Sequence, residues 1–416
     1  MSSSDANTEA IVLSGGGSYG AYEVGILKAL LTGASPATGF QPLDADMFVG
    51  TSAGAINAAV LVSHLSAGPS AAVQYLEHLW SNVIAEQPGG CGNGVYRVRT
   101  PLEFLDPNCL IMNPLRALLD IASDTNFFAR DWFDRAVRFA GSRESLVRRT
   151  LQLVDLSTLV STDPLNLRLA EAVPLEGIRQ SDKILRVVTT NFTTGELQVF
   201  TNEDIVERVG YKAILASAAI PGFFPPVDIN GQFYVDGGTL MNTPINTAIA
   251  GASTLHVVYM DPDVQNIPVE RLRDTIDALD RTIVVALAYA INQQIEVARD
   301  INRTLELLAQ ADDSGPISDA ELRSFFHVAS RIKRRIQTSS PYRKLTIHRY
   351  HPHEDLGGVL GLMNLGYDRI RGLIDRGFND AAKHDCGASG CVTGGPGMPG
   401  ETMGAGAAMY DRRVAT

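Results

Sequence analysis

The segment Gly50-Thr51-Ser52-Ala53-Gly54 has the residue types and spacing of a serine nucleophile. It fits the pattern G-x-S-x-G between a short apolar run and a helical pattern, where such a serine is presented on a sharp turn. The flanking glycines remove side chains that would collide there, and the N-terminus of the following helix favours negative charge nearby. The alternative is an ordinary turn whose serine caps a helix. Ser52 is therefore a candidate nucleophile for acyl transfer.

A second glycine-rich turn, Ser14-Gly15-Gly16-Gly17-Ser18-Tyr19-Gly20, also lies between an apolar run and a helical pattern. Successive glycines let main-chain N–H groups converge on one point, which suits either a phosphate or the oxyanion of an acyl-transfer intermediate. The spacing G-x-G-x-x-G also occurs in dinucleotide-binding folds, which place an acidic residue at the end of the second strand. Here Asp44 and Asp46 precede that strand, so the dinucleotide hypothesis is disfavoured.

A third segment, Val235-Asp236-Gly237-Gly238, ends an apolar run with a carboxylate and two glycines. The alternative interpretation is a turn aspartate that binds its own backbone. Taken with the serine and the glycine loop, Asp236 completes a set of groups suited to acyl transfer: a nucleophile, a base and oxyanion donors. A solvated aspartate is a weak base, so the hypothesis requires Asp236 to be shielded from water and within hydrogen-bond reach of Ser52.

The elements that must position these residues alternate between strands and helices. Near the N-terminus we predict strands at 10–13 and 47–49 and helices at 21–31 and 55–65, which is typical of a layered α/β sheet. Further along, apolar runs and turn signals, including Asn230-Gly231, predict two hairpins. The later elements are strands at 184–192, 196–201, 227–229, 232–235, 255–260 and 344–350, with helices at 205–217, 283–308 and 368–383.

These motifs, in this order, resemble the patatin-like phospholipase family. Gly15 to Gly20 matches the family's oxyanion motif, Gly50 to Gly54 its G-x-S-x-G, and Asp236-Gly237-Gly238 its D-G-[AG]. The pieces 216–221, 224–226 and 242–244 fit as well, so that the resemblance extends in patches over 8–262. It implies a three-layer α/β fold with a central mixed sheet, and a Ser52–Asp236 dyad assisted by N–H groups of the Gly15–Gly20 loop.

The resemblance further implies a lipid acyl hydrolase of the phospholipase A or lysophospholipase type, acting through an acyl-enzyme. The substrate would be a lipid or another fatty-acyl ester. Tyr19 stands where many family members carry Arg or Lys, which leaves neutral acyl esters in consideration. The sequence does not define the lipid class, the sn position, an activator or the oligomeric state.

The expected domain organisation has a flexible start at 1–8 and a patatin-like catalytic domain at 9–262. Regular alternation stops at about 80–180, which we interpret as an insertion and a candidate lid. A C-terminal helical region at 263–384 is expected to pack on the catalytic domain, and a glycine-rich disordered tail at 385–416. The apolar stripe at 283–308 favours core packing, with membrane contact as the alternative.

Composition and cysteine use exclude several other classes of protein. The chain has 416 residues and a formal net charge of −11, which argues against nucleic acid as a partner. We find no segment with the length of a membrane-spanning helix and no signal peptide, so a cytoplasmic protein is expected, with peripheral membrane contact left open. Four cysteines do not make a disulfide framework. Cys386 and Cys391 lack C-x-x-C spacing, so no metal and no cofactor are expected.

Two other functional hypotheses remain open at this point. One is a Ser-Asp-His esterase that takes its base from His348, His351 or His353, which lie in or just after a late strand; we interpret these histidines as a solvated strand end instead. The other is a catalytically silent protein whose glycine loop binds a lipid or nucleotide. A further possibility is acyl transfer to an acceptor other than water. His256, inside an apolar strand, is expected to be a packed residue.

Overall fold

The computed structural model describes residues 8–90, 92–99, 111, 114–141, 160–249, 251–260, 275–313 and 344–393. Eight strands form one sheet in the order β10-β9-β1-β2-β5-β8-β7, and β6 pairs with β5 outside this path. The strands are β1 (Glu9–Leu13), β2 (Met47–Thr51), β5 (Ile184–Asn191), β6 (Glu196–Thr201), β7 (Val227–Ile229), β8 (Gln232–Asp236), β9 (Thr254–Val258) and β10 (Thr346–Tyr350).

The sheet is mixed. Strands β10, β9, β1, β2 and β5 are parallel neighbours, whereas β6, β7 and β8 are joined to their neighbours in antiparallel fashion. The β7–β8 hairpin turns at Asn230 and Gly231, whose φ angles of 55° and 82° are those expected of this dipeptide. The parallel strands β1 and β2 each end in a glycine-containing turn, and these turns meet at the same edge of the sheet.

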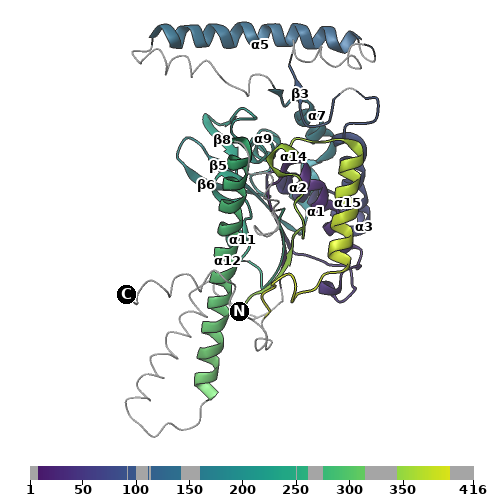
Figure 1. Ribbon diagram of the computed structural model, residues 1–416, viewed down its shortest axis with the longest axis vertical. Helices are drawn as coiled ribbons and strands as arrows, with labels where there is room; N and C mark the ends of the chain where they lie inside the picture. Colours follow the sequence, from purple (N-terminus) through teal and green to yellow (C-terminus); the bar gives the residue numbers. More distant parts are fainter. Residues whose placement is uncertain are drawn as a thin grey trace.

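Helices cover both faces of the sheet (Figure 1). Alternate strand residues enter two separate apolar cores, one beneath each helical layer. One face carries α1 (Gly20–Leu31), α2 (Ala53–His64), α3 (Pro69–His78), α8 (Leu175–Gln180), α9 (Gly210–Ser217) and α15 (Tyr367–Ala382); the other carries α11 (Ile245–Ile249) and α12 (Thr275–Asp313). The three-layer α/β architecture predicted from the sequence is thus confirmed.

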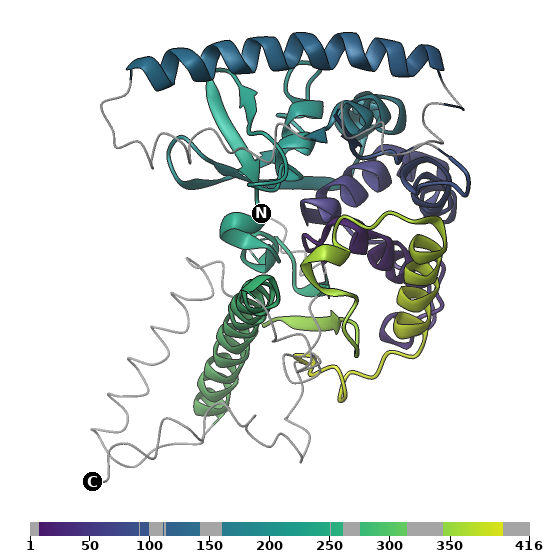
Figure 2. The ribbon, with the colours of Figure 1, turned by 45° about the horizontal axis from the view of Figure 1, so that its top comes forward.

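The predicted insertion at about 80–180 contains a π-helical turn (η4, Leu79–Ile84), a two-stranded ribbon and a long helix. The ribbon pairs β3 (Arg97–Val98) with β4 (Val160–Ser161), and α5 (Pro114–Gly141) lies across one end of the molecule, away from the sheet (Figures 1 and 2). Arg97 and Arg99 both bind the carboxylate of Asp124 on α5. Apolar residues at helical spacing also occur in the sequence at 143–154, which lies outside the described residues. The described part of the segment also contains α7 (Asp163–Ala172) and α8.

The C-terminal part of the chain is built into the same sheet and is not a separate helical region. Strand β10 pairs in parallel with β9, and α15 packs on α1. The apolar stripe at 283–308 lies on α12. Part of it packs in the core, as the sequence analysis favoured, because Ile291, Ile295 and Ala298 are buried against the sheet. The boundary expected at 262 therefore does not divide two structural units, because residues on both sides of it complete one sheet and its two cores.

The start of the expected disordered tail is also corrected. Residues 385–393 are packed against the sheet, with Cys391 and Val392 buried. The backbone of Val392 exchanges two hydrogen bonds with Ile347 of β10, at 2.7 and 2.9 Å. Glycine content alone suggested disorder, but these backbone pairs order the segment. The rest of the tail, 394–416, and residues 1–7 lie outside the described residues. Among the helices the structure describes, none combines the length and apolarity needed to cross a bilayer.

Candidate active site

Ser52 lies on the sharp turn between β2 and α2. Its backbone angles, φ 55° and ψ −124°, are uncommon for a residue with a side chain, and it is 3% exposed. A Cβ atom on Gly50 would lie 2.3 Å from the carbonyl oxygen of Gly54, and one on Gly54 would lie 2.6 Å from that of Leu13. The two glycines of the motif are therefore required by close backbone packing, as the sequence pattern indicates.

Asp236 reaches Ser52 because their strands end next to each other along one edge of β5. β2 pairs with residues 184–188 of β5 and β8 pairs with residues 189–191, whereas β6 pairs along the opposite edge of β5. The carboxyl accepts a 2.7 Å hydrogen bond from the N–H of Gly238 and also binds the Ser52 side chain. Asp236 is 4% exposed. The shielding that the sequence hypothesis requires is present, and the Ser52 side chain is one of the groups that interact with the Asp236 carboxyl.

Burial changes the chemistry of this carboxyl. Desolvation raises the pKa of Asp236 from 3.8 to about 7, and the hydrogen bonds from Ser52 and Gly238 oppose that rise. A carboxylate with this pKa is a far stronger proton acceptor than a solvated aspartate. It is about half ionised at pH 7 and mostly ionised above that pH, so it can accept a proton from a serine hydroxyl there.

The glycine loop borders the same cavity as Ser52 and Asp236, through Gly15, Gly16, Gly17 and Tyr19. A Cβ atom on Gly15 would lie 3.1 Å from the Cβ of Ser52, so the loop approaches the serine closely. Within the described part of the chain, the N–H groups of Gly16 and Gly17 have no hydrogen-bond partner. They are therefore available to an oxyanion formed next to Ser52.

Two residues of the loop do not face the cavity. The hydroxyl of Ser18 donates a 2.7 Å hydrogen bond to the carbonyl of Gly361, and Ser18 is buried. Gly20 starts α1 and packs against Trp80 and Ala53. Both residues fix the loop against its neighbours, and the N–H of Gly15 donates to the carbonyl of Asn242, so Gly16 and Gly17 are the glycines of the loop whose N–H groups remain unpaired among the described residues.

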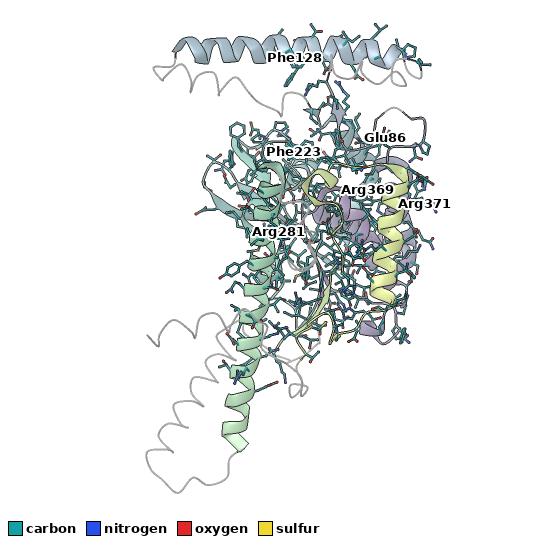
Figure 3. The ribbon with its side chains drawn as sticks, in the orientation of Figure 1. Glu86, Phe128, Phe223, Arg281, Arg369 and Arg371 are labelled. Carbon is teal, nitrogen blue, oxygen red and sulfur yellow. The ribbon has the colours of Figure 1, made fainter. Side chains whose placement is uncertain are left out.

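The hydroxyl of Tyr19 donates a 2.6 Å hydrogen bond to the carbonyl of Gly358, the first residue of α14 (Gly358–Gly361). The guanidinium of Arg369 lies 5.5 Å from the centre of the Tyr19 ring. Arg369 comes from α15 and points toward the α14 segment (Figure 3). A cation therefore lies next to Tyr19 even though the loop position itself is uncharged, and the sequence gave no indication of it.

The cavity has a volume of about 260 Å³ and is mostly apolar. One wall is formed by α12 and another by the segment that follows β10. Both lie outside the three sequence motifs. The lining side chains from these segments and from the proline corner are Ile220, Pro221, Ile283, Val284, Leu287, Leu356 and Leu362. Their positions are far apart in the sequence and share no motif, so only the folded chain brings them together. Such walls suit an acyl chain.

Buried hydrogen bonds hold the serine turn and the loop in place. Ser217 accepts a 2.9 Å hydrogen bond from the N–H of Ser52 and donates one of 2.7 Å to the carbonyl of Val188. Thr51 donates to the carbonyl of Met241. Because each of these side chains bonds backbone of another segment, the turn depends on contacts as well as on its own glycines.

The histidines that the structure describes lie outside this cavity. None of the cavity-lining residues in the described chain is a histidine, so His348, His351 and His353 are not placed to act on Ser52. His351 is buried and stacks on Tyr259, and His256 is packed between His348 and Tyr350. The described histidines thus lie away from the cavity, whereas Asp236 lines it. Among the described residues, Asp236 and Asp355 are the carboxylates that line the cavity, and no cysteine or histidine does so.

The chain was compared with known proteins. The model of a family described as patatin-like phospholipase matches residues 11–249. A protein named "Probable lipid hydrolase 463L", from Invertebrate iridescent virus 6, is 36% identical over 74 residues, which are 18% of this chain. That segment covers 26% of the viral protein's length. The structure of VipD from Legionella pneumophila aligns with 90% of this chain and 67% of its own, at 18% identity and a TM-score of 0.33.

Proposed function

Because this chain belongs to the patatin-like phospholipase family, we propose that it is a lipid acyl hydrolase with a Ser52–Asp236 dyad. The observation that carries the proposal is the meeting of three groups in one apolar cavity. These are the serine on its strained turn, a shielded carboxyl that binds the serine side chain, and the unpaired N–H groups of Gly16 and Gly17. The name of the viral relative, a probable lipid hydrolase, agrees with it.

In the proposed reaction, the oxygen of the Ser52 hydroxyl attacks the ester carbonyl while Asp236 takes the proton of that hydroxyl. The N–H groups of Gly16 and Gly17 bind the oxyanion of the tetrahedral intermediate. Collapse of the intermediate breaks the ester bond, the alcohol leaves with the proton from Asp236, and an acyl-enzyme remains. Water then attacks the acyl group while Asp236 takes one of its protons. The bond between the acyl group and the Ser52 oxygen breaks, Asp236 returns the proton to that oxygen, and the free fatty acid is released.

We assign the substrate to phospholipase A or lysophospholipase chemistry. The apolar walls from α12 and the segment after β10 would hold the acyl chain, with the scissile carbonyl between Ser52 and the glycine loop. Arg369, beside Tyr19, supplies a positive charge that could face an anionic head group at this end of the cavity. A neutral lipid would gain nothing from that charge, so the two classes can be told apart by measurement.

The test is a serine-reactive fluorophosphonate probe combined with a panel of phospho-, lyso-, galacto- and neutral lipids. We expect the wild type to be labelled and to release fatty acid, and Ser52→Ala to do neither. Ser63→Ala is the matched control, because Ser63 is also buried on α2 but bonds only its own helix and His64. A folded wild type that is not labelled would favour a silent lipid-binding protein. Activity lost in His351→Ala but retained in Asp236→Ala would overturn the dyad.

A further inference from the structure

Four metal-ligating side chains converge at the edge of the sheet, outside the cavity described above. His348 lies on β10, His384 follows α15, and Cys386 and Cys391 lie in the segment after it. One donor atom from each lies within 4.8 Å of all the others. Both cysteines are free thiols. None of the four side chains lines the cavity that contains Ser52.

The distances between these atoms suit one tetrahedral ion. The Sγ of Cys386 lies 3.4 Å from Nδ1 of His348 and 3.5 Å from Nε2 of His384, and the Sγ of Cys391 lies 3.4 Å from the same Nε2. A tetrahedral Zn²⁺ with ordinary bond lengths keeps sulfur and nitrogen ligands about 3.6 Å apart. Two thiolates with two imidazoles are a ligand set that structural zinc sites use.

The surroundings of the cluster hold its ligands in position. The Asp385 carboxylate accepts hydrogen bonds from the N–H groups of Gly387 and Ala388, and the N–H of Cys391 donates to the carbonyl of Cys386, which closes the loop. The N–H of Arg349 points at the sulfur of Cys391, at 3.3 Å. Donors of this kind stabilise a metal-bound thiolate.

Aromatic contacts fix the imidazole rings. His348 stacks on His256 at 5.0 Å between ring centres, and His384 packs against Tyr350 at 4.5 Å. Cys391 is buried and Cys386 is partly exposed, so an ion could enter from solvent. The ligands are thus oriented before any ion binds, which lowers the entropic cost of binding.

We propose that these four side chains bind one structural zinc ion: His348, His384, Cys386 and Cys391. The ion fastens residues 384–393 over β10, the edge strand of the sheet, where Val392 already pairs with Ile347. Figure 2 shows the yellow end of the described chain returning from α15 toward this strand. Covering an exposed edge prevents pairing with other chains. The sequence analysis missed this site because the two cysteines lack C-x-x-C spacing and one of the four ligands, His348, comes from a strand that is distant in sequence.

The test measures metal in the full-length protein, purified under reducing conditions from zinc-supplemented medium and without a histidine tag. We expect about one zinc per chain in the wild type, and less than about a tenth of that in Cys386→Ser, Cys391→Ser and His348→Ala. Cys91→Ser and His78→Gln are the matched controls and should keep their zinc. Ser52→Ala should also keep it, so the outcome is independent of the proposed esterase.

A second measurement uses only the wild-type protein, so that it does not depend on whether the variants fold. After zinc is removed from the wild type, added Co²⁺ should give the visible absorption bands of a tetrahedral ion with thiolate ligands. Hydrogen exchange in residues 384–393 should be faster in the zinc-free protein and slow again when zinc returns. A wild-type protein that contains no zinc and gives no cobalt bands overturns the proposal. So does a Cys386–Cys391 disulfide whose reduction leaves the protein unable to bind either metal.

Discussion

At the scale of single residues, the main question is how an aspartate can replace the histidine of a triad. An ordinary histidine has a pKa close to neutral pH, about 6.5. A solvated aspartate has a pKa of about 4, and its carboxylate is therefore a weak base. In this structure, removal from water brings the pKa of Asp236 to about 7, close to that of an ordinary histidine. Desolvation therefore supplies the basicity that the proposed dyad requires.

This pKa predicts the pH dependence of the reaction. Asp236 must be ionised to accept a proton, so kcat/KM should rise about tenfold per pH unit below about pH 7 and level off above it. The measurement is kcat/KM for a soluble acyl ester between pH 4 and pH 9, on protein shown by circular dichroism to stay folded. An inflection near pH 4 would mean that Asp236 is solvated and would contradict this account.

The same pKa predicts a gain in stability for Asp236→Asn. Folding raises the pKa of this carboxyl, which means that the folded state disfavours its charged form. The resulting loss of stability is absent below about pH 3.8, grows as the pH rises, and is complete above about pH 7. At pH 8 the variant should be inactive, with a free energy of unfolding larger by on the order of 2–4 kcal/mol. Urea unfolding at pH 8 and pH 4 tests this, since the gain should shrink at the lower pH.

At the scale of elements, the serine turn is held by its neighbours as well as by its glycines. Ser217, the last residue of α9, links the N–H of Ser52 to the carbonyl of Val188 on β5. Asn57 on α2 similarly binds Gly20, Glu23 and the indole of Trp80, joining α1, α2 and η4. These buried bonds set the distance between the glycine loop and the serine.

We predict that Ser217→Ala lowers kcat more than it raises KM. The variant leaves the N–H of Ser52 without its buried partner and removes the hydrogen bond to the carbonyl of Val188, which should cost about 1–3 kcal/mol of stability and about tenfold in kcat. Ser63→Ala is the control, because it removes a buried hydroxyl on α2 that does not touch the turn. Equal kinetic effects in the two variants would show that Ser217 has no positioning role.

At the scale of the whole molecule, the cavity is completed by parts of the chain that lie beyond all three motifs. Helix α12 covers one face of the sheet; its Ile291 and Ile295 enter the core, and Leu287, one turn earlier, lines the cavity. The segment after β10 forms another wall and bonds the glycine loop through Gly358 and Gly361. By contrast, no described residue of the 80–180 insertion lines the cavity, so its role as a lid stays a proposal.

This arrangement predicts that α12 sets the preferred acyl-chain length. Leu287→Trp should fill part of the cavity and lower kcat/KM for long-chain esters about tenfold or more relative to short-chain esters. Tyr289→Trp, two residues away at a side chain that is 65% exposed, should leave this ratio unchanged. A series of nitrophenyl esters of increasing chain length is the measurement. An unchanged ratio in Leu287→Trp would show that the acyl chain lies elsewhere.

The sequence by itself determined the elements and the three motifs. Hydrophobic periodicity located nearly every strand of the sheet, because a buried strand needs a local apolar run. The turns were equally local: Gly50, Gly54 and the Asn230-Gly231 pair are dictated by backbone geometry over a few residues. Helix boundaries were less well determined: α9 begins at Gly210 and not at 205, and α12 (Thr275–Asp313) extends beyond the predicted 283–308 at both ends.

Only the tertiary structure decided what surrounds those motifs. The pKa of Asp236 depends on burial by segments far along the chain, and the walls from α12 and the segment after β10 have no signature of their own. The sequence also did not reveal that residues 385–393 are ordered, or that cysteines and histidines cluster there. A glycine-rich sequence suggests disorder, and the strand that pairs with this segment lies far away in the chain. Local interactions can be predicted from neighbours in sequence, whereas desolvation and convergent ligands arise only from contacts between distant residues.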